Sequence, residues 1–478
     1  MIGKGKVWGF RMTSITFYGG INEIGGNKIL VKDRDTSIFL DFGMSFKKMG
    51  KYFEEFIQPR TCNGLGDLIE LGIIPDIECL YRNDLLKNEG RKMTKKPCVD
   101  GVLFSHAHAD HSWHASLLHH EIPLYCTPET KCIFQAAQES GRAKYYSEVF
   151  CLKENFVNRS KKPETTRKFN LIESGKRFKI GSIEVLPVAV DHSVPGAVGY
   201  ILFCSDAIIA YTGDIRLHGK NNAWTKDFVQ KAADAKPDAL IIEGTRIKEG
   251  MRWNSEMQVL KDVGDFVKKT PKLAVCAFPP RDLDRLDSFY RVALANNRRL
   301  AISSKQMYLL ELMKQQTKLK LPSLKDFDIY MERCSWGQFA DRDYDNWERK
   351  YLNYPNMVKY EDISKKQERY LFYCDFYSIK ELIDLKPKQG SNYIYSLSEP
   401  FNEEMELDFE RLKNWLTHFK LPLLQSHASG HCSREELKEV IGRINPKKVF
   451  PIHTEQPLEF KEIAKGVEIK GVGEEVKV

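Results

Sequence analysis

The chain has 478 residues, of which 42% are hydrophobic and 29% are charged. This composition is typical of globular proteins and excludes disordered, collagen-like and low-complexity classes. At roughly 150 residues per domain, the length predicts two or three domains. The formal net charge of +8 permits a polyanionic partner without requiring one.

No apolar segment approaches the roughly 18 to 20 residues that span a bilayer, and the N-terminus lacks the features of a secretion signal. The 11 cysteines are spread singly along the chain and form no CxxC pair. This usage favours reduced thiols over a disulfide framework. We therefore expect a cytoplasmic protein with no membrane partner.

The first half of the sequence is rich in predicted strands. Residues 15–20, 27–31 and 37–42 carry β-branched and aromatic residues punctuated by glycine, which predicts a meander of short strands. Residues 99–105 predict another strand, and a helix is expected directly after it, over residues 110–119. Four more strands, paired through two-residue hairpin turns, are predicted at 177–180, 183–190, 199–204 and 207–212. The pattern indicates a β-sandwich with helices between its strands.

From residue 238 onward, strands alternate with helices. The predicted strands cover residues 238–245, 272–278, 299–303, 327–332, 370–375 and 392–398. Alternation of this kind is typical of a mostly parallel sheet. We therefore expect a second domain to begin near residue 246.

The clearest chemical motif is HAHADH, which follows the predicted strand at 99–105. It places His106, His108, Asp110 and His111 on one strand-to-helix turn, and these residue types suit zinc or a similar divalent ion. The first two histidines are two positions apart, so they point the same way from an extended backbone. The other two residues follow around the turn and can face a neighbouring ion, which allows a second metal.

A two-metal site needs further ligands, including a carboxylate that bridges the ions. His192, Asp214 and His453 each follow a predicted strand and can reach a shared edge of the sheets. We therefore group them with the HxHxDH turn as candidate metal ligands.

These motifs carry a family resemblance. HAHADH, DFG around Asp41, VDH at His192 and TGD at Asp214 occur in the order that resembles the metallo-β-lactamase fold. IEGT at 242–245, SHASGH at 426–431 and PIHTE at 451–455 are similar to motifs A, B and C of the β-CASP nucleases. GGINEIGGN at 19–27 and the SGHxxxxEL form of motif B look most like the ribonuclease J family. The resemblance extends from about residue 14 to 465.

The resemblance implies an α/β fold in which a β-CASP domain is inserted into an αββα metallo-β-lactamase sandwich. The sandwich is expected at 13–245 and again at 426–470, and the inserted domain, with its mostly parallel sheet and flanking helices, at 246–425.

The resemblance also implies two Zn²⁺ ions per chain, with Mn²⁺ or Mg²⁺ as substitutes. His106, His108 and His192 would hold one ion. Asp110, His111 and His453 would hold the other, and Asp214 would bridge the two ions. Asp41 is expected to bind no metal and instead to orient a ligating histidine through its other ring nitrogen.

The implied activity is that of a zinc-dependent ribonuclease that acts on single-stranded RNA as an endonuclease, a 5′–3′ exonuclease or both, with a homodimer as a candidate assembly. Two metals suit phosphodiester hydrolysis because they activate water and stabilise an in-line displacement. We expect a hydroxide nucleophile held near Asp214, and Asp110 is a further candidate catalytic residue. His431 is the candidate general acid, since an imidazole titrates near neutrality, and Glu243 would orient it.

Other residues are candidate contacts to nucleic acid. The backbone N–H groups of Ser429 and Gly430 have small side chains beside them and could approach a phosphate closely. For His427, phosphate contact and plain packing remain open. Arg281, Arg285 and Lys305, at predicted helix starts, are candidate clamps for the strand backbone, with ordinary surface charge as the alternative.

Two alternatives to the ribonuclease remain. The first is a single-stranded DNA nuclease with the same chemistry, because residue chemistry alone does not separate the two substrates. The second is a catalytically silent RNA-binding or scaffold subunit, although silent members typically lose ligands that are all present here. A small-molecule hydrolase is disfavoured by motif B and the inserted segment.

Overall fold

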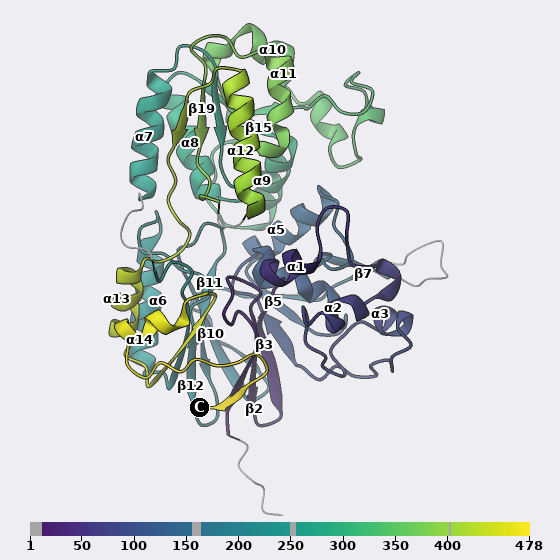
Figure 1. Cartoon of the computed structure of the whole chain (residues 1–478), viewed down its shortest axis with the longest axis vertical. Coiled ribbons are helices and arrows are strands. Elements are labelled where there is room, and N and C mark those ends of the chain that lie inside the picture. The colour runs from purple at the N-terminus through teal and green to yellow at the C-terminus, as the bar shows by residue number, and fades with distance from the viewer. Residues whose placement is uncertain (1–11, 155–163, 249–254, 401–402) are drawn as a thin grey trace, which may run out of the picture.

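The computed structural model describes residues 12–154, 164–248, 255–400 and 403–478, which form two lobes (Figure 1). The lower lobe contains two packed sheets. The first has the order β22-β1-β2-β3-β4-β5-β8 and the second β21-β13-β12-β11-β10-β9. The strands of the first are β1 (Ser14–Gly19), β2 (Lys28–Asp33), β3 (Thr36–Phe42), β4 (Gly101–Leu103), β5 (Leu124–Cys126), β8 (Phe169–Leu171) and β22 (Glu475–Lys477). Those of the second are β9 (Phe178–Ile180), β10 (Ile183–Ala189), β11 (Val198–Phe203), β12 (Ile208–Tyr211), β13 (Ala239–Glu243) and β21 (Lys448–Ile452).

The two sheets enclose an apolar core. Alternate residues of each strand point inward, among them Phe17 and Leu40 from the first sheet and Tyr200, Ile241 and Phe450 from the second. Helices cover the outer faces, as expected for an αββα sandwich. They are α6 (Asn222–Ala235) and α13 (Arg434–Ile444) on the second sheet, and α2 (Gly66–Glu70), α3 (Asn83–Asn88) and α5 (Pro128–Glu139) on the first. Shorter elements of this lobe are α1 (Phe46–Tyr52), β6 (Cys151–Lys153), β7 (Glu164–Thr166) and α14 (Phe460–Ile463).

The upper lobe is built around a third sheet of order β17-β16-β15-β18-β14-β19-β20. Each described pair of neighbouring strands in it is parallel, as the alternating sequence pattern predicts. Its strands are β14 (Ala274–Ala277), β15 (Arg299–Ser303), β16 (Asp328–Tyr330), β17 (Met357–Val358), β18 (Tyr370–Tyr373), β19 (Asn392–Tyr395) and β20 (Leu423–Gln425). One face packs on α7 (Glu256–Lys268), α8 (Leu283–Ala295) and α9 (Ser304–Gln316), and the other on α10 (Tyr360–Lys365), α11 (Leu382–Leu385) and α12 (Glu403–His418).

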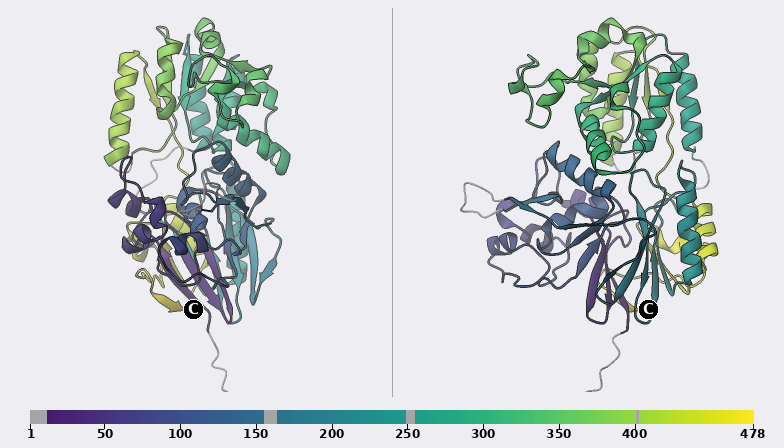
Figure 2. Two further views of the ribbon diagram at one scale, coloured as in Figure 1. Left: turned by 90° about the vertical axis from the view of Figure 1, so that its right-hand side faces the viewer. Right: turned by 180° about the vertical axis from the view of Figure 1, so that it is seen from behind.

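The chain leaves the lower lobe after β13 and returns to it before β21. These two strands are adjacent and parallel in the second sheet, although the whole third sheet lies between them in sequence. Figure 2 shows the late, yellow segments back among the purple and blue elements of the lower lobe. This topology agrees with an inserted domain, and its boundaries at 246 and 425 stay a prediction.

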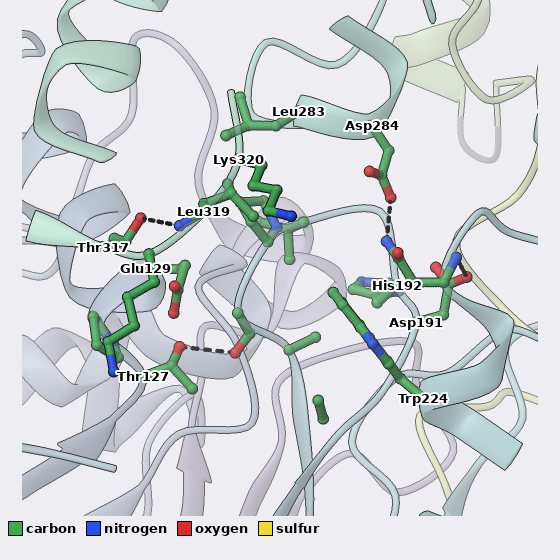
Figure 3. Close-up of a pocket in the computed structure, with 18 of the residues that line it drawn as sticks. Thr127, Glu129, Asp191, His192, Trp224, Leu283, Asp284, Thr317, Leu319 and Lys320 are labelled. Atoms are coloured by element: carbon green, nitrogen blue, oxygen red, sulfur yellow. Dashed lines mark hydrogen bonds between the residues drawn. The ribbon is translucent and has the colours of Figure 1, made fainter. Parts of the chain in front are cut away.

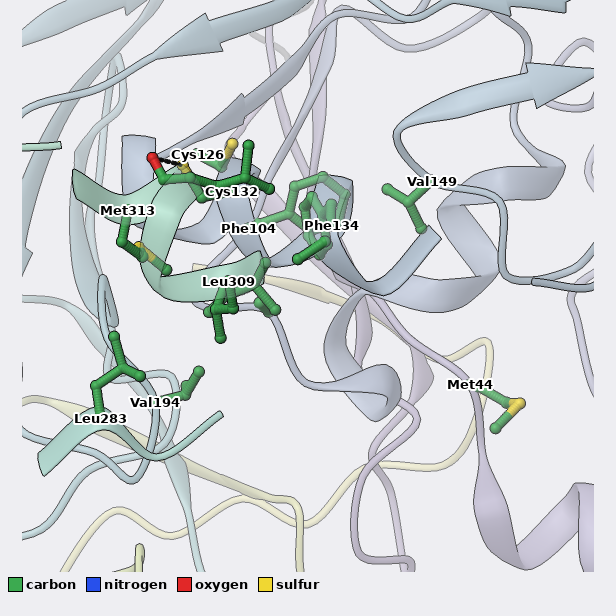
Figure 4. Close-up of a cluster of buried hydrophobic side chains, with 14 of the residues drawn as sticks. Met44, Phe104, Cys126, Cys132, Phe134, Val149, Val194, Leu283, Leu309 and Met313 are labelled. Carbon is green, nitrogen blue, oxygen red and sulfur yellow. Dashed lines mark hydrogen bonds between the residues drawn. The ribbon is translucent and has the colours of Figure 1, made fainter. Parts of the chain in front are cut away.

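The lobes share a continuous apolar core at their junction. In Figure 4, Leu309 and Met313 of α9 approach Phe104 and Phe134 of the lower lobe, and all four belong to one buried cluster. The rings of Phe104 and Phe134 meet edge to face with centroids 5.3 Å apart. Apolar packing thus holds the third sheet against the sandwich.

The helix expected over residues 110–119 is the main local prediction that is wrong. The structure has a single α-helical turn, α4 (Ala109–Ser112), followed by a 3₁₀ segment, Trp113–Leu117. Ser112 leaves the α region with φ −135°, and its hydroxyl donates to the carbonyl of His108 at 2.8 Å. A serine that bonds the preceding turn in this way competes with continuation of the helix.

Two further expectations concern the chain as a whole. All 11 cysteines lie among the described residues, and each is a free thiol, as predicted. Within the described ranges, no helix combines the length and the apolar character that crossing a membrane requires.

Candidate metal centre

The predicted ligands meet where strands of both sandwich sheets end, at the junction with the upper lobe. Three histidines and Asp110 follow β4, His192 follows β10, Asp214 follows β12 and His453 follows β21. Ligand atoms within 4.8 Å of one another form three overlapping groups. These groups are His106, His108, His192 and Asp214; Asp110, His111 and His453; and Asp214, His431 and His453.

Ring nitrogens in the first group face one another. The Nδ1 atom of His108 lies 3.0 Å from Nε2 of His106 and 3.1 Å from Nε2 of His192. In the second group, Nε2 of His453 lies 3.1 Å from Oδ2 of Asp110. Asp214 sits between the groups, because its Oδ2 atom is 3.2 Å from His111 Nε2 and 3.6 Å from His106 Nε2.

The charge states of the first group suit a bound cation. Burial lowers the pKa of His106, of His192 and of His108, the last to about 4, so their nitrogens are free to ligate. Burial opposes the ionisation of Asp214, but the adjacent His111 and His453 hold its pKa well below its usual range. Its Oδ1 atom is buried and has no hydrogen-bond partner among the described residues. An orphaned carboxylate oxygen amid convergent imidazoles fits a metal centre.

Asp41 lies beside His111, where a residue that orients a ligating histidine is expected. Its Oδ2 atom accepts hydrogen bonds from Ser105 Oγ at 2.7 Å and Tyr211 OH at 2.5 Å, and it lies 2.7 Å from His111 Nδ1. Its Oδ1 atom accepts from the backbone of Ser105 at 2.7 Å. Asp41 has a φ of +57°, a strained value that the surrounding contacts must maintain. Ser105 and Tyr211 were not predicted from the sequence, where neither stands out from its strand.

Two further supporting contacts were also missed. Thr245 places its Oγ1 atom 2.8 Å from Nδ1 of His453, whose own φ is +53°. The carbonyl of Gly430 lies 2.6 Å from Nδ1 of His192. A Cβ at Gly430 would come within 2.7 Å of Ser193 Oγ and 3.0 Å of His192 Cε1, so a side chain there would crowd the candidate ligand. Both residues belong to motifs that the sequence singles out, A and B, but the sequence does not indicate which histidine each contacts.

His431 and Glu243 adopt the predicted pairing. Nδ1 of His431 lies 3.2 Å from both carboxylate oxygens of Glu243 and 3.9 Å from Asp214 Oδ2. Burial alone would lower the pKa of His431, but the negative charge of Glu243 raises it to about 9. Its side chain keeps 21% exposure, whereas Glu243 is fully buried. His431 is thus the accessible member of the pair.

The candidate nucleic-acid contacts differ in how exposed their side chains are. The prediction for Arg285 is wrong, because its side chain is fully buried and bonds Glu256, Ser396 and Ala428. Lys305 is exposed at the start of α9, and Arg281 is half-buried just before α8.

The residues of motif B are held mainly by protein contacts. His427 packs between Arg285 and the carbonyl of Ser396, each 3.2 Å from its Nδ1 atom, which favours the packing alternative. Ser429 accepts a hydrogen bond from the backbone of His431 at 3.1 Å, and its own carbonyl lies 2.9 Å from Nε2 of His218.

A cavity of about 510 Å³ opens beside this cluster at the junction of the lobes (Figure 3). His192 and Trp224 line one wall, and Thr127, Leu283 and Lys320 lie on other sides. Its volume is within the range of small-molecule sites.

Comparison with known families agrees with this architecture. Residues 82–268 match the beta-lactamase superfamily domain, and residues 425–473 match the Zn-dependent metallo-hydrolase RNA specificity domain. The second match contains His431 and His453. The chain is a metallo-β-lactamase-fold protein that resembles ribonuclease J. The zinc-dependent domain and the His/Asp cluster together support a metal cofactor for this ribonuclease J-like protein.

Curated relatives extend the likeness over most of the chain. Ribonuclease J of Helicobacter pylori strain J99 is 20% identical over 92% of this chain, and ribonuclease J of Mycoplasma genitalium is 23% identical over 94%. The matches cover 56% and 69% of those proteins, so the chain spans little more than half the length of the Helicobacter relative. A crystal structure of a protein of unknown function from Enterococcus faecalis V583 shares the fold, with a TM-score of 0.73, 23% identity and coverage of 98% of this chain and 100% of that one.

Proposed function

We propose that this protein is a zinc-dependent ribonuclease that hydrolyses phosphodiester bonds of single-stranded RNA at a site for two Zn²⁺ ions. The observation that carries the proposal is the position of Asp214. Its carboxylate lies between two groups of candidate ligands and within 3.9 Å of His431, which itself pairs with Glu243. A shared carboxylate beside a paired imidazole is the arrangement that two-metal hydrolysis needs.

In this proposal, each ion has its own set of three side chains and Asp214 is common to both. The sets are His106, His108 and His192 for one ion, and Asp110, His111 and His453 for the other. When bound, two zinc ions would lower the pKa of water and neutralise charge on the scissile phosphate. Mn²⁺ and Mg²⁺ are the candidate substitutes, but both prefer oxygen ligands, so the five histidines of the two sets favour Zn²⁺.

The chain's own residues supply the remaining functions. His431 donates a proton from its ring to the leaving oxygen of the RNA, and Glu243 holds the ring in place through Nδ1. Asp41, Thr245 and the carbonyl of Gly430 each fix the orientation of one candidate ligand histidine. Rigid support of this kind keeps the reacting groups aligned.

Two comparisons support RNA as the substrate, and a feature of the cavity supports a single strand. The segment that carries His431 and His453 matches a domain described as an RNA specificity domain, and curated relatives are named ribonuclease J. The cavity beside His192 offers an aromatic side chain, Trp224, on which a base could stack. A single strand fits the proposal because stacking requires unpaired bases.

The decisive test is hydrolysis of matched single-stranded RNA and DNA by the zinc-loaded protein. We expect faster cleavage of RNA, and faster cleavage of DNA would favour the single-stranded DNA nuclease. No cleavage of either would favour the silent RNA-binding subunit.

A second assay defines the mode of cleavage. Circular RNA reports endonuclease activity, whereas linear RNAs with a 5′-monophosphate or 5′-triphosphate report exonuclease activity and sensitivity to the 5′ end. Light scattering under the same conditions tests the homodimer.

A further inference from the structure

A buried row of alternating charges crosses the junction between the sandwich and the third sheet. Its four members are Asp191, Arg216, Glu256 and Arg285, all at most 2% exposed. Arg216 donates from Nε to Asp191 at 2.8 Å and from Nη1 to Glu256 Oε1 at 3.0 Å. Arg285 donates to the two oxygens of Glu256 at 2.8 and 3.0 Å. Glu256 is therefore the one carboxylate in the row that bonds both arginines.

The row joins segments that are far apart in sequence. Asp191 and Arg216 follow the sandwich strands β10 and β12, whereas Glu256 and Arg285 lie in the first turns of α7 and α8 in the inserted segment. Although burial opposes ionisation, the two arginines lower the pKa of Glu256 to about 2. Its carboxylate is thus charged and saturated with donors, which is the condition under which buried charges persist.

The same arginines also reach the backbone of motif B. Arg285 Nη2 donates to the carbonyl of Ala428 at 3.2 Å, and Arg216 Nη1 donates to the carbonyl of Ser429 at 3.4 Å. The next carbonyl, that of Gly430, lies 2.6 Å from Nδ1 of His192. Three consecutive carbonyls therefore connect the buried row to a candidate metal ligand.

The row approaches the site from a second direction as well. Asp191, at one end of the row, immediately precedes His192 in the chain, and Ser429 Oγ accepts a hydrogen bond from the backbone of His431 at 3.1 Å. Both the candidate ligand and the candidate proton donor are therefore adjacent to residues that the two arginines hold.

We infer that Glu256 is a positioning residue, which clamps Arg216 and Arg285 so that motif B holds His192 and His431 in register over Asp214. The inference deepens the proposed function and rests on it for the role of His431. Loss of the carboxylate would leave two buried guanidinium groups without their shared partner. Their hydrogen bonds to the carbonyls of residues 428–429 would weaken, and His192 and His431 would no longer be held in position over Asp214.

The test compares Glu256→Gln with Glu311→Gln. Glu311 is a matched control because it is also a buried carboxylate of the inserted segment, bonded by Lys350 and Tyr351 rather than by the junction. For Glu256→Gln we expect zinc affinity, measured by competition with a chelator, to fall about 10- to 100-fold, as when support of a ligand histidine is lost. At saturating zinc, we expect kcat on RNA to fall by a similar factor with KM nearly unchanged. Equal behaviour of the two variants would overturn the inference.

A second variant separates positioning from stability. Asp191→Asn, Arg216→Met, Glu256→Leu and Arg285→Met together replace all four charges of the row with uncharged side chains, a change that buried ion networks often tolerate. We expect this quadruple variant to recover the Tm of the wild type while zinc affinity and kcat stay low. Recovery of all three quantities would show that the row only stabilises the fold. If Glu256→Gln weakens zinc binding but the wild type cleaves no RNA, the proposed function fails and the positioning role stands.

Discussion

The sandwich and the inserted sheet both bring charged groups to their common junction, but they differ in whether these groups have hydrogen-bond partners there. At the strand ends of the sandwich, imidazole nitrogens of His106, His108 and His192 face one another, and Asp214 Oδ1 has no partner among the described residues. On the side of the inserted sheet, Glu256 and Arg285 are fully paired. Ligand atoms without hydrogen-bond partners lie at the proposed catalytic site, whereas the charged groups that hold this site in place have all their hydrogen bonds within the protein.

Backbone strain occurs in both regions. In the sandwich, Asp41 and His453 adopt positive φ values of 57° and 53° within the cluster itself. In the inserted segment, Lys386 has a positive φ at the C-terminal cap of α11, where this conformation is common, and the loop residues Ser335 and Phe339 have φ values of 48° and 54°. The difference is that the strain at Asp41 and His453 falls on residues that contact the candidate ligands or belong to them.

The largest effect should come from the residue that both ligand groups share. Asp214→Ala removes the carboxylate between them, so we expect loss of bound zinc and a loss of cleavage greater than the roughly 10²- to 10⁴-fold contribution of a general acid. Metal analysis and RNA hydrolysis measure both. A variant that retains the full metal content and activity would remove the basis for the two-metal site.

His431→Ala should have the next largest effect, and it should lower the cleavage rate without removing the metals. We expect the metals to remain and cleavage to slow about 10²- to 10⁴-fold, because the candidate proton donor is lost. His418→Ala is the control, since His418 is exposed at the end of α12. An unchanged rate for His431→Ala would mean that another group protonates the leaving oxygen.

Asp41→Asn should have an intermediate effect. The amide keeps the shape but weakens the hold on His111 Nδ1, so metal affinity or activity should fall about 10- to 100-fold. Asp100→Asn is a suitable comparison, because Asp100 is exposed and its carboxylate accepts a hydrogen bond from the backbone N–H of Ser37 in β3 at 2.9 Å. Equal metal affinities for the two variants would assign Asp41 to the fold alone.

The sequence predicts the longer sandwich strands to within one or two residues and the parallel character of the third sheet, but it misses the short strands β5, β8, β17, β20 and β22. Short strands with β-branched residues and tight turns depend on local interactions, so their pattern is visible in the chain. The prediction of a helix over residues 110–119 is wrong because the hydroxyl of Ser112 donates to the carbonyl of His108. Helix propensity does not predict this hydrogen bond. The local pattern therefore misses structure that a single side-chain contact decides.

For the candidate site, the sequence identifies the residues that converge but not those that support them. His106 and Asp214 stand out because metal-binding residue types cluster at strand ends. Tyr211 and Thr245 are ordinary strand and loop residues, and only the tertiary structure brings them to Asp41 and His453. Arg285 was misassigned for the same reason, because burial of an arginine depends on partners that are remote in sequence.

The smallest effect should come from Lys305, the exposed member of the candidate RNA contacts. It lies at the start of α9, the helix that packs on α5 of the sandwich. If Lys305 contacts one phosphate, Lys305→Ala should weaken binding slightly and equally for all RNA sequences, and the slope of log affinity against log salt should decrease by about 0.7. Lys231→Ala, on the outer helix α6 and paired with Asp227, should leave the slope unchanged. An unchanged slope for Lys305→Ala as well would assign it to surface charge, and the half-buried Arg281 would remain as the candidate RNA contact of the inserted segment.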